Sequence, residues 1–339
     1  MTTSFNLRLL GVGIVALALV VTPFVLSEQP YLVRIVTTAL IYAIAAYGMN
    51  IILGLTGQLS LAHGAFFGIG AYVVGLLTTD RDWSFWASFA LAILVTTALG
   101  YVSGLIALRT QGSYFAIFTM ALGFLVFIVI TRWESVTHAH SGVSGVKFPE
   151  NIGPIDFTQE TTMYFFVLVV LALAIYTTHA LLTSPAGRSL VAIRTSEDLA
   201  KSIGVNVAVS KQLAFTASAG IAGLAGGLFA SFTGFIGPDS AAIDLTFQFL
   251  LFLLIGGMGT VMGPLVGSLL VAFLFEMLQD LESYRFIVLG PIIVLLVIFA
   301  PKGIVGYLNA LLSRRRSRPP TDPTATDAAD HRDVVEEVH

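Results

Sequence analysis

The residues of this chain that are able to perform covalent chemistry are few, and their spacing assembles no catalytic site. The 339-residue sequence contains no cysteine, which excludes thiol nucleophiles, disulfides and thiolate metal sites. Its apolar runs contain no His-Glu-x-x-His pattern, no Gly-x-Ser-x-Gly elbow and no carboxylate pair four residues apart. Glu276 is the one acidic residue clearly inside an apolar run, and its place near the end of that run favours an interfacial side chain over a proton relay.

Metal and nucleotide chemistry are equally poorly supported. His138 and His140 stand near the carboxylates of Glu134, Glu150 and Asp156, but this set lacks cysteines and histidines at helical spacing, so an ordinary surface loop is favoured over a metal site. The sequence has no Gly-x-x-x-x-Gly-Lys-Ser/Thr phosphate loop. We therefore expect no metal, no cofactor, no binding of nucleic acid and no ATP hydrolysis by the chain itself.

Two glycine-rich segments interrupt the apolar pattern at corresponding places in two halves of the chain. They are residues 54–64, GLTGQLSLAHG, and residues 255–264, IGGMGTVMGP. Two interpretations stay open: breaks that line a translocation path, where freed backbone groups are tolerated, or tight turns at a membrane face. The residues that would form the breaks are Gly54, Gly57, Gly256, Gly257, Gly259 and Pro264.

A translocation path would need polar or amphipathic side chains in or beside the apolar runs. His63 also fits a hydrogen-bonded packing residue with no part in transport. The candidates for the path are Gln58, Ser60, His63 with its neighbour Gly64, Tyr114 and Gln248.

The stretch 184–211 is 28 residues of polar sequence between two long apolar runs. Unpaired charges are too costly in hydrocarbon, so this stretch must stand in water at one membrane face. Ser184 followed by Pro185 predicts a helix that begins there and runs to about Ile193.

A second short helix is predicted within the same stretch. Thr195 with Asp198 three residues later fits a capping box, and Gly204 is a natural stop. A small apolar face ringed by charges suits docking into a groove on a soluble partner, whereas the alternative is a solvated connecting loop. The predicted face consists of Leu199, Ala200 and Ile203, and the candidate coupling residues are these three with Arg188, Arg194, Glu197, Asp198 and Gly204.

Composition defines the elements that position these residues. The chain is 56% hydrophobic and 11% charged, with a mean hydropathy of +0.88, whereas soluble chains average about 25% charged residues. We predict an all-α polytopic membrane protein with about 8–10 transmembrane helices, including the glycine-broken hairpins, and a retained first span. The predicted spans are 1–26, 35–53, 65–77, 84–108, 114–131, 162–182, 212–232, 243–255, 264–278 and 286–300.

Charge placement orients the chain and divides it. With the N-terminus in the cytoplasm, 12 of the 17 Lys and Arg residues lie inside, so both termini and the stretch 184–211 are predicted to be cytoplasmic. Residues 1–312 form the predicted permease domain, and the polar, acidic residues 313–339 a disordered tail behind an arginine cluster that touches anionic lipid. The five residues on the other side are Arg34, Arg81, Arg132, Lys147 and Arg285.

Several stretches in fixed order resemble the permease subunits of branched-chain amino-acid ABC importers, specifically the M-type. The matching segments are residues 47–72 around GLTGQLSLAHG, 108–119 (LRTQGSYFAIFT), 184–194 (SPAGRSLVAIR) with parts of 200–211, 255–267, and 299–306 (FAPKGIVG). Residues 138–145 keep only part of the family's Gly/Thr-rich segment, and the tail has no recognised counterpart.

The resemblance implies a function and an assembly. It implies a non-catalytic subunit in a bacterial inner membrane that translocates branched-chain amino acids or a related small polar solute. Its partners would be an H-type permease, two ATP-binding subunits and an extracytoplasmic solute-binding protein, with residues 184–211 as the segment that couples to the ATPase. A urea or short-amide importer remains an alternative, as does a stand-alone carrier or channel, which the scarcity of intramembrane titratable groups disfavours.

Overall fold

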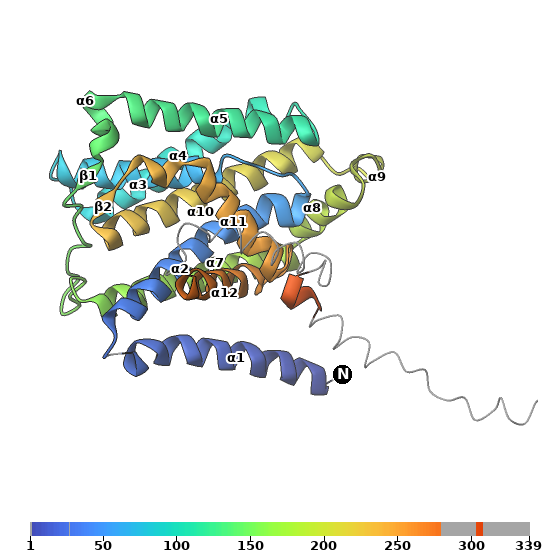
Figure 1. The fold of residues 1–339 in the computed structure, drawn as a ribbon. Helices are drawn as coiled ribbons and strands as arrows, with labels where there is room; N and C mark the ends of the chain where they lie inside the picture. The colour runs from blue at the N-terminus through green and yellow to red at the C-terminus, as the bar shows by residue number, and fades with distance from the viewer. Residues whose placement is uncertain (1, 27, 279–302, 308–339) are drawn as a thin grey trace, which may run out of the picture.

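The computed structural model describes residues 2–26, 28–278 and 303–307 (Figure 1). Nine of the ten predicted spans are helices within that part, while the predicted span 286–300 and the tail 313–339 lie outside the described residues. Within the described residues, five helices are long and apolar enough to cross a membrane. They are α2 (Pro30–Met49) continued by the π-helix η1 (Asn50–Leu55), α4 (Phe85–Ala107), α5 (Ser113–Arg132), α7 (Glu160–Thr183) and α10 (Val207–Thr233).

Shorter apolar helices accompany them. The 14 residues of α11 span about 21 Å at about 1.5 Å per residue, less than the hydrocarbon core of about 30 Å. α11 alone is therefore too short to span the hydrocarbon core, and the glycine-containing segment 257–262 joins it to α12. The chain is a polytopic helical membrane protein. The shorter apolar helices are the part Val15–Val25 of α1 (Thr2–Val25), α3 (His63–Thr79), α11 (Ile243–Gly256) and α12 (Gly263–Met277).

Two long helices form the centre of the fold. In the most apolar 18-residue stretch of each helix, 78% of α2 with η1 and 67% of α10 is buried inside the protein. The corresponding stretches of α4, α5 and α7 are only 17–22% buried. Figure 1 shows α10 in the middle of the molecule, with α3 and α4 on one side and α2 and α7 on the other. The outer helices therefore keep apolar faces for lipid or for partner subunits.

Small residues allow the central helices to touch. The backbones of Gly70 on α3 and Gly223 on α10 lie so close that a Cβ atom at Gly70 would overlap the Gly223 carbonyl group. Gly226 lies in the same way against the Phe67 carbonyl group. These small residues let α3 and α10 pack with their backbones in contact.

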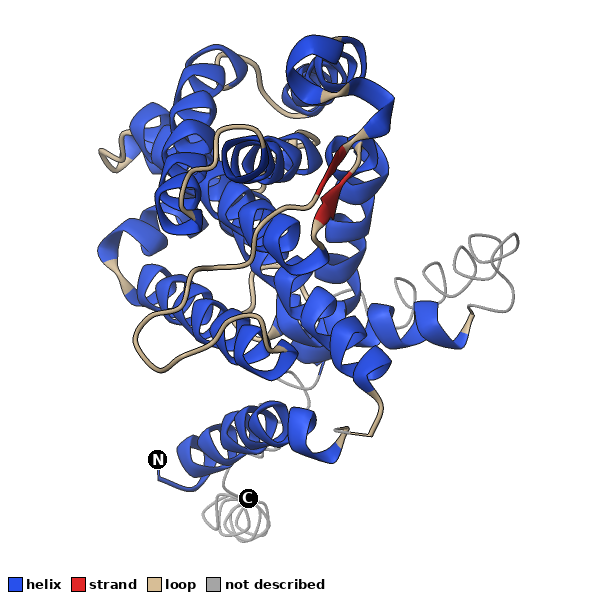
Figure 2. Cartoon of the chain, turned by 90° about the vertical axis from the view of Figure 1, so that its left-hand side faces the viewer, coloured by secondary structure: helices blue, strands red, loops and turns tan. Residues whose placement is uncertain are grey.

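The two ends of the bundle differ. At one end stand α6 (Glu134–Thr137), η2 (Ala139–Ser141) and a two-residue ladder in which β1 (Val143–Ser144) pairs antiparallel with β2 (Phe235–Ile236), drawn in red in Figure 2. This ladder corrects the all-α prediction, because Gly234 ends α10 with positive φ and turns the chain back along β1. After it, η3 (Pro238–Ala241) leads into α11. At the other end stand α8 (Pro185–Thr195) and α9 (Glu197–Ser202).

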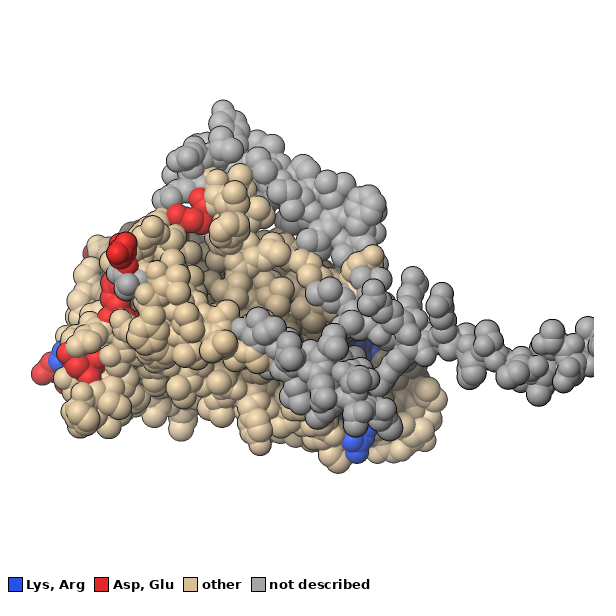
Figure 3. All heavy atoms as spheres, turned by 90° about the horizontal axis from the view of Figure 1, so that it is seen from below, with Lys and Arg blue, Asp and Glu red and all other residues tan. Residues whose placement is uncertain are grey.

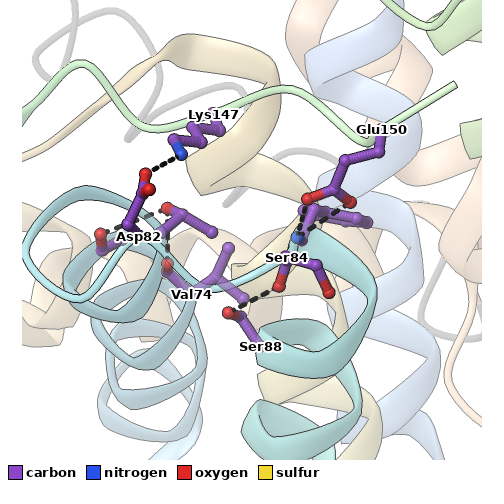
Figure 4. Close-up of polar contacts among 9 residues, drawn as sticks. Val74, Asp82, Ser84, Ser88, Lys147 and Glu150 are labelled. Atoms are coloured by element: carbon purple, nitrogen blue, oxygen red, sulfur yellow. Dashed lines mark hydrogen bonds and ion pairs between the residues drawn. The ribbon is translucent and has the colours of Figure 1, made fainter.

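Carboxylates fix the loop 132–160 to the helix ends beneath it. Both oxygens of Glu150 accept from the backbone N–H of Phe85, at 2.8 and 3.0 Å, where they satisfy the start of α4 (Figure 4). The hydrogen bond from Lys147 to Asp82 holds the pKa of that carboxyl below its ordinary value. Nε2 of His138 lies 3.0 Å from Oδ2 of Asp80. Among the described residues, no group of three or more His, Asp or Glu side chains lies close enough together to hold a metal ion.

Candidate coupling and translocation site

The first glycine break follows a change of helix type in α2. At Asn50 the α-helix widens to the π-helix η1, whose i to i+5 pattern is rare and often marks functional sites. The helix ends at Leu55, and Gly57 then turns the chain with a φ of 75° into the irregular segment 56–62 before α3. The second break, residues 257–262 between α11 and α12, turns at Gly257 and Gly259, with φ values of 121° and 74°.

The two breaks lie against each other, although about 200 residues separate them in sequence. Asn50 joins them: its Oδ1 accepts from the Gly259 N–H at 2.8 Å, and its Nδ2 donates to the Thr260 carbonyl at 3.1 Å. One turn earlier, the Tyr47 hydroxyl donates to the Val261 carbonyl at 2.7 Å. Asn50 and Tyr47 thus satisfy backbone groups that the second break leaves free. Neither was predicted, although a buried amide beside a Gly-x-x-Gly pattern is a usable signal.

Arg194 of α8 contacts this junction directly. Its Nη1 donates to the Gly54 carbonyl at 2.5 Å. A Cβ atom at Gly57 would lie 3.2 Å from Cγ of Arg194, and one at Gly259 would lie 2.8 Å from its Nη1. The guanidinium group therefore lies against both breaks, where bulkier residues would displace it.

The remaining predicted break residues support the α11–α12 hairpin. Gly256 packs on the backbones of Gly263 and Gly267, so closely that a Cβ atom would overlap the Gly263 carbonyl. Pro264 stands in the first turn of α12, where its missing N–H costs no hydrogen bond. The structure thus brings Gly54, Gly57 and Gly259 to Arg194 and places Gly256 and Pro264 in the hairpin behind them.

The short helices α8 and α9 begin much as the sequence predicts, with one correction. The Ser184 hydroxyl caps α8 by accepting from the Gly187 N–H at 3.0 Å. The cap of α9, however, is Ser196 and not Thr195, because α8 continues through Thr195 and the Ser196 side chain accepts from the Leu199 N–H. Gly204 follows the end of α9 with a φ of 87°, as its predicted role as a stop requires.

The predicted apolar face of α9 is wrong for one of its three residues. Ala200 is only 1% exposed and packs with Ile193 and Val207, whereas Leu199 is 62% exposed and Ile203 is 68% exposed. Positions 199 and 203 share a helix face. Position 200 is rotated by about 100° around the helix axis from position 199, and its side chain therefore faces α8. The exposed apolar pair, Leu199 and Ile203, is what we call the α9 knob.

Ion pairs fix α9 to the start of α10. Oε2 of Glu197 accepts a hydrogen bond from Nζ of Lys211 at 2.5 Å, and Oε1 of Glu197 lies 3.3 Å from Nζ of Lys201. Partial burial raises the pKa of Glu197, but the hydrogen bonds and charges of Lys211 and Lys201 outweigh this effect and hold the pKa below its ordinary value. The Lys211 side chain is only 4% exposed, so this pair belongs to the packing of the segment. The other predicted charged residues differ: Asp198 is exposed, and Arg188 donates to the Thr183 carbonyl behind it.

The predicted path residues do not gather at one place. His63 is buried at the start of α3, where its Nε2 lies 2.6 Å from Oγ of Ser218, which donates in turn to the Gly48 carbonyl. Gly64 donates to Oγ1 of Thr246 at 2.7 Å, which fixes α3 to the start of α11.

The other path candidates are scattered. Ser60 is buried in the segment that leads to α3, whereas Gln58 is partly exposed. Tyr114 is 75% exposed on α5, and Gln248 lines a separate cavity beside α2 and α12. A single path through all of these residues stays a prediction.

The fold and the site define a class of protein: a polytopic membrane protein with two broken hairpins at its core and a polar helix pair attached to them. Residues 31–300 match the family model described as the branched-chain amino acid transport system permease component. The chain belongs to this family, and it is a non-catalytic permease component of an ABC transport system. The resemblance seen in its motifs is confirmed.

Named relatives agree with the family match. The LivM permease of the high-affinity branched-chain amino acid transport system of Salmonella typhimurium is 31% identical over 327 residues, covering 90% of this chain and 76% of the relative. LivM of Escherichia coli K12 is 30% identical, over 88% and 75% of the two chains. LivH of the same organism is 25% identical over 291 residues, covering 80% of this chain and 93% of the relative. No solved structure matches the chain.

Proposed function

We propose that this chain is the M-type permease subunit of an ATP-driven importer of branched-chain amino acids or a related small polar solute. Its partners are an H-type permease, two ATP-binding subunits, one of which seats on α8 and α9, and a solute-binding protein that faces the loop 132–160. In this assembly the termini and residues 184–211 are cytoplasmic. Residues 1–312 form the permease, and 313–339 a cytoplasmic tail.

Charge distribution supports this orientation. Seen from below in Figure 3, the acidic side chains visible on that face gather at the end where β1 and α6 lie in Figure 1. Arg188, Arg194, Lys201 and Lys211 stand on or beside α8 and α9 at the other end. The cytoplasmic excess of positive charge is the expected pattern for a bacterial membrane protein.

The observation that carries the proposal is the hydrogen bond from Arg194 to the Gly54 carbonyl. On its outer side the helix pair presents the α9 knob, which is exposed and suited to a groove on a soluble partner. On its inner side it contacts both broken hairpins through Arg194. Movement of the knob by a nucleotide-driven partner is therefore transmitted to the breaks without an intervening flexible linker.

The test is reconstitution with the candidate partners in proteoliposomes. We expect uptake of labelled leucine, isoleucine or valine that requires both ATP and the binding protein. Urea and acetamide serve as competing solutes in the same preparation. Uptake of an amide but of no amino acid would contradict the proposed solute, and uptake by this chain without any ATP-binding subunit would contradict the proposed function as a whole.

A further inference from the structure

A cavity of about 380 Å³ lies between α2, α11 and α12, away from the junction of the breaks. Two of its lining residues stand toward the Pro30 end of α2, the end opposite to α8: Arg34 is one turn into α2, and Glu276 is in the last turn of α12. Between Arg34 and Tyr42, eight residues of helix reach about 12 Å along the cavity. Its volume lies within the usual range for small-molecule sites.

The lining of this cavity combines two opposite charges with apolar surface. Arg34 and Glu276 contribute a guanidinium and a carboxylate, while Phe252, Ala272 and the ring of Tyr42 contribute apolar contacts. The Tyr31 hydroxyl, one helical turn before Arg34, lies 3.4 Å from Oε2 of Glu276. Residues three apart on a helix are neighbours, with Cβ atoms about 5–6 Å apart, so Arg34 stands beside the tyrosine that contacts Glu276.

Among the residues that the structure describes, neither charge has a strong ionic partner. Arg34 pairs with Glu160 at 3.8 Å, and both side chains are about half exposed, which makes the pair weak. A guanidinium has five donors and can keep Glu160 while it binds a second carboxylate. Glu276 stands in the last turn of α12 and is partly exposed, so its carboxylate is accessible to a polar ligand at the membrane interface.

We infer that this cavity is a transient binding site for an α-amino acid, in which Arg34 binds the carboxylate, Glu276 binds the ammonium group and Phe252 with Ala272 contacts the branched side chain. The inference rests on the proposed function, and it assigns the transported amino acid a binding site within the permease. An uncharged amide offers neither Arg34 nor Glu276 an ionic partner, and neither does a lipid acyl chain. Gln248 adds a neutral amide to the lining of the cavity.

The test measures ligand-dependent thermal stabilisation of the complete permease–ATPase complex in nanodiscs, without the binding protein, since a ligand that binds the folded state raises the unfolding temperature. The probes are leucine, leucinamide, which lacks the carboxylate, and 4-methylpentanoate, which lacks the ammonium group. Wild type is expected to bind leucine at least about tenfold more tightly than either analogue. Arg34→Gln should abolish the preference over leucinamide alone, and Glu276→Gln the preference over 4-methylpentanoate alone.

Matched controls separate this site from general effects of charge. Arg81→Gln and Glu134→Gln remove the same charges from exposed positions at the same end of the bundle and should leave both preferences unchanged. Because each preference compares two ligands on one variant, partial misfolding does not imitate its loss. Equal binding of all three probes by wild type, or equal effects of Arg34→Gln and Arg81→Gln, would overturn the inference and leave an apolar cleft for lipid.

Uptake by the wild-type complex is measured in the same preparation. ATP-driven leucine uptake without charge-selective binding overturns the assignment of the cavity only. Absence of ATP-driven uptake of any amino acid overturns the proposed function instead, whatever the cavity binds.

Discussion

Replacing Arg194 with glutamine removes the hydrogen bond that links α8 to the broken hairpins while preserving the α9 knob. The guanidinium Nη1 donates to the Gly54 carbonyl at 2.5 Å, and Cγ lies 3.2 Å from the position of a Cβ atom at Gly57. Glutamine is shorter by more than one bond and uncharged, so it retains part of the packing and loses the charged donor. Helix α8 itself should persist, because Ser184 still caps its first turn.

The expected effect follows from the strength of the lost interaction. A hydrogen bond to a charged group contributes about 1.5–3 kcal/mol, and about 1.4 kcal/mol corresponds to a factor of ten in an equilibrium constant. If this bond transmits movement of α8 to the breaks, its loss lowers solute uptake per ATP hydrolysed by about ten- to a hundredfold. ATP hydrolysis by the docked partner should persist, because Leu199 and Ile203 still form the docking surface.

The assay measures uptake and ATP hydrolysis on the same proteoliposomes for wild type, Arg194→Gln and Arg109→Gln. Arg109 is exposed at the same end of the bundle, in the loop whose Gln111 reaches Glu197, so its replacement controls for loss of cytoplasmic charge. Uptake per ATP that stays within twofold of wild type in Arg194→Gln would refute the reasoning. So would an equal loss in Arg109→Gln.

Three further predictions concern the same region. Gly54→Ala places a Cβ atom 2.8 Å from the Gly259 nitrogen and closer still to Oδ1 of Asn50, so it should lower stability by about 1–3 kcal/mol in thermal unfolding, whereas Gly13→Ala, with no atom within 4 Å, should not. Leu199→Asp should weaken pull-down of the ATP-binding subunits by about ten- to a hundredfold without loss of membrane insertion, since burying a leucine contributes about 1.5–3 kcal/mol; undiminished capture would count against docking at the knob. Because the pKa of Glu197 is held below its ordinary 4.5, its ion pairs stabilise α9 above that pH and are lost as the pH falls through the lowered value. Hydrogen exchange of α9 amides, corrected for intrinsic rates, should therefore stay constant from about pH 5.5 to 8 and rise only below about 4.5, and Glu197→Gln should remove this pH dependence.

Local signals in the sequence predicted most of the helices, and local physics explains why. The cap at Ser184, the stop at Gly204 and the apolar runs each depend on residues a few positions apart. The same holds for the glycine breaks at Gly57 and Gly259, whose positive φ values only glycine adopts freely.

What depends on distant residues was not predictable from one sequence. The polar spacing of α9 does not reveal that α8 folds back and covers Ala200 while Leu199 and Ile203 stay exposed. Tyr114 is polar and lies in an apolar run, but nothing local indicates that it points away from the protein.

The junction of the breaks illustrates the same limit at longer range. Asn50 and Gly259 are 209 residues apart, and their hydrogen bond exists only because α2 packs beside the α11–α12 hairpin. Arg194 and Gly54 are 140 residues apart. The sequence contained both partners of each pair, but only the packing of the helices brings them into contact.

The central claim is that the α9 knob lies in the cytoplasm and is covered by an ATP-binding partner. The chain has no native cysteine, so Ile203→Cys provides a single labelling site. We expect a membrane-impermeant maleimide to label this cysteine in inverted vesicles stripped of ATP-binding subunits, and we expect added subunits to protect it. Labelling from outside intact cells, or labelling in inverted vesicles that bound ATPase does not reduce, would contradict the account.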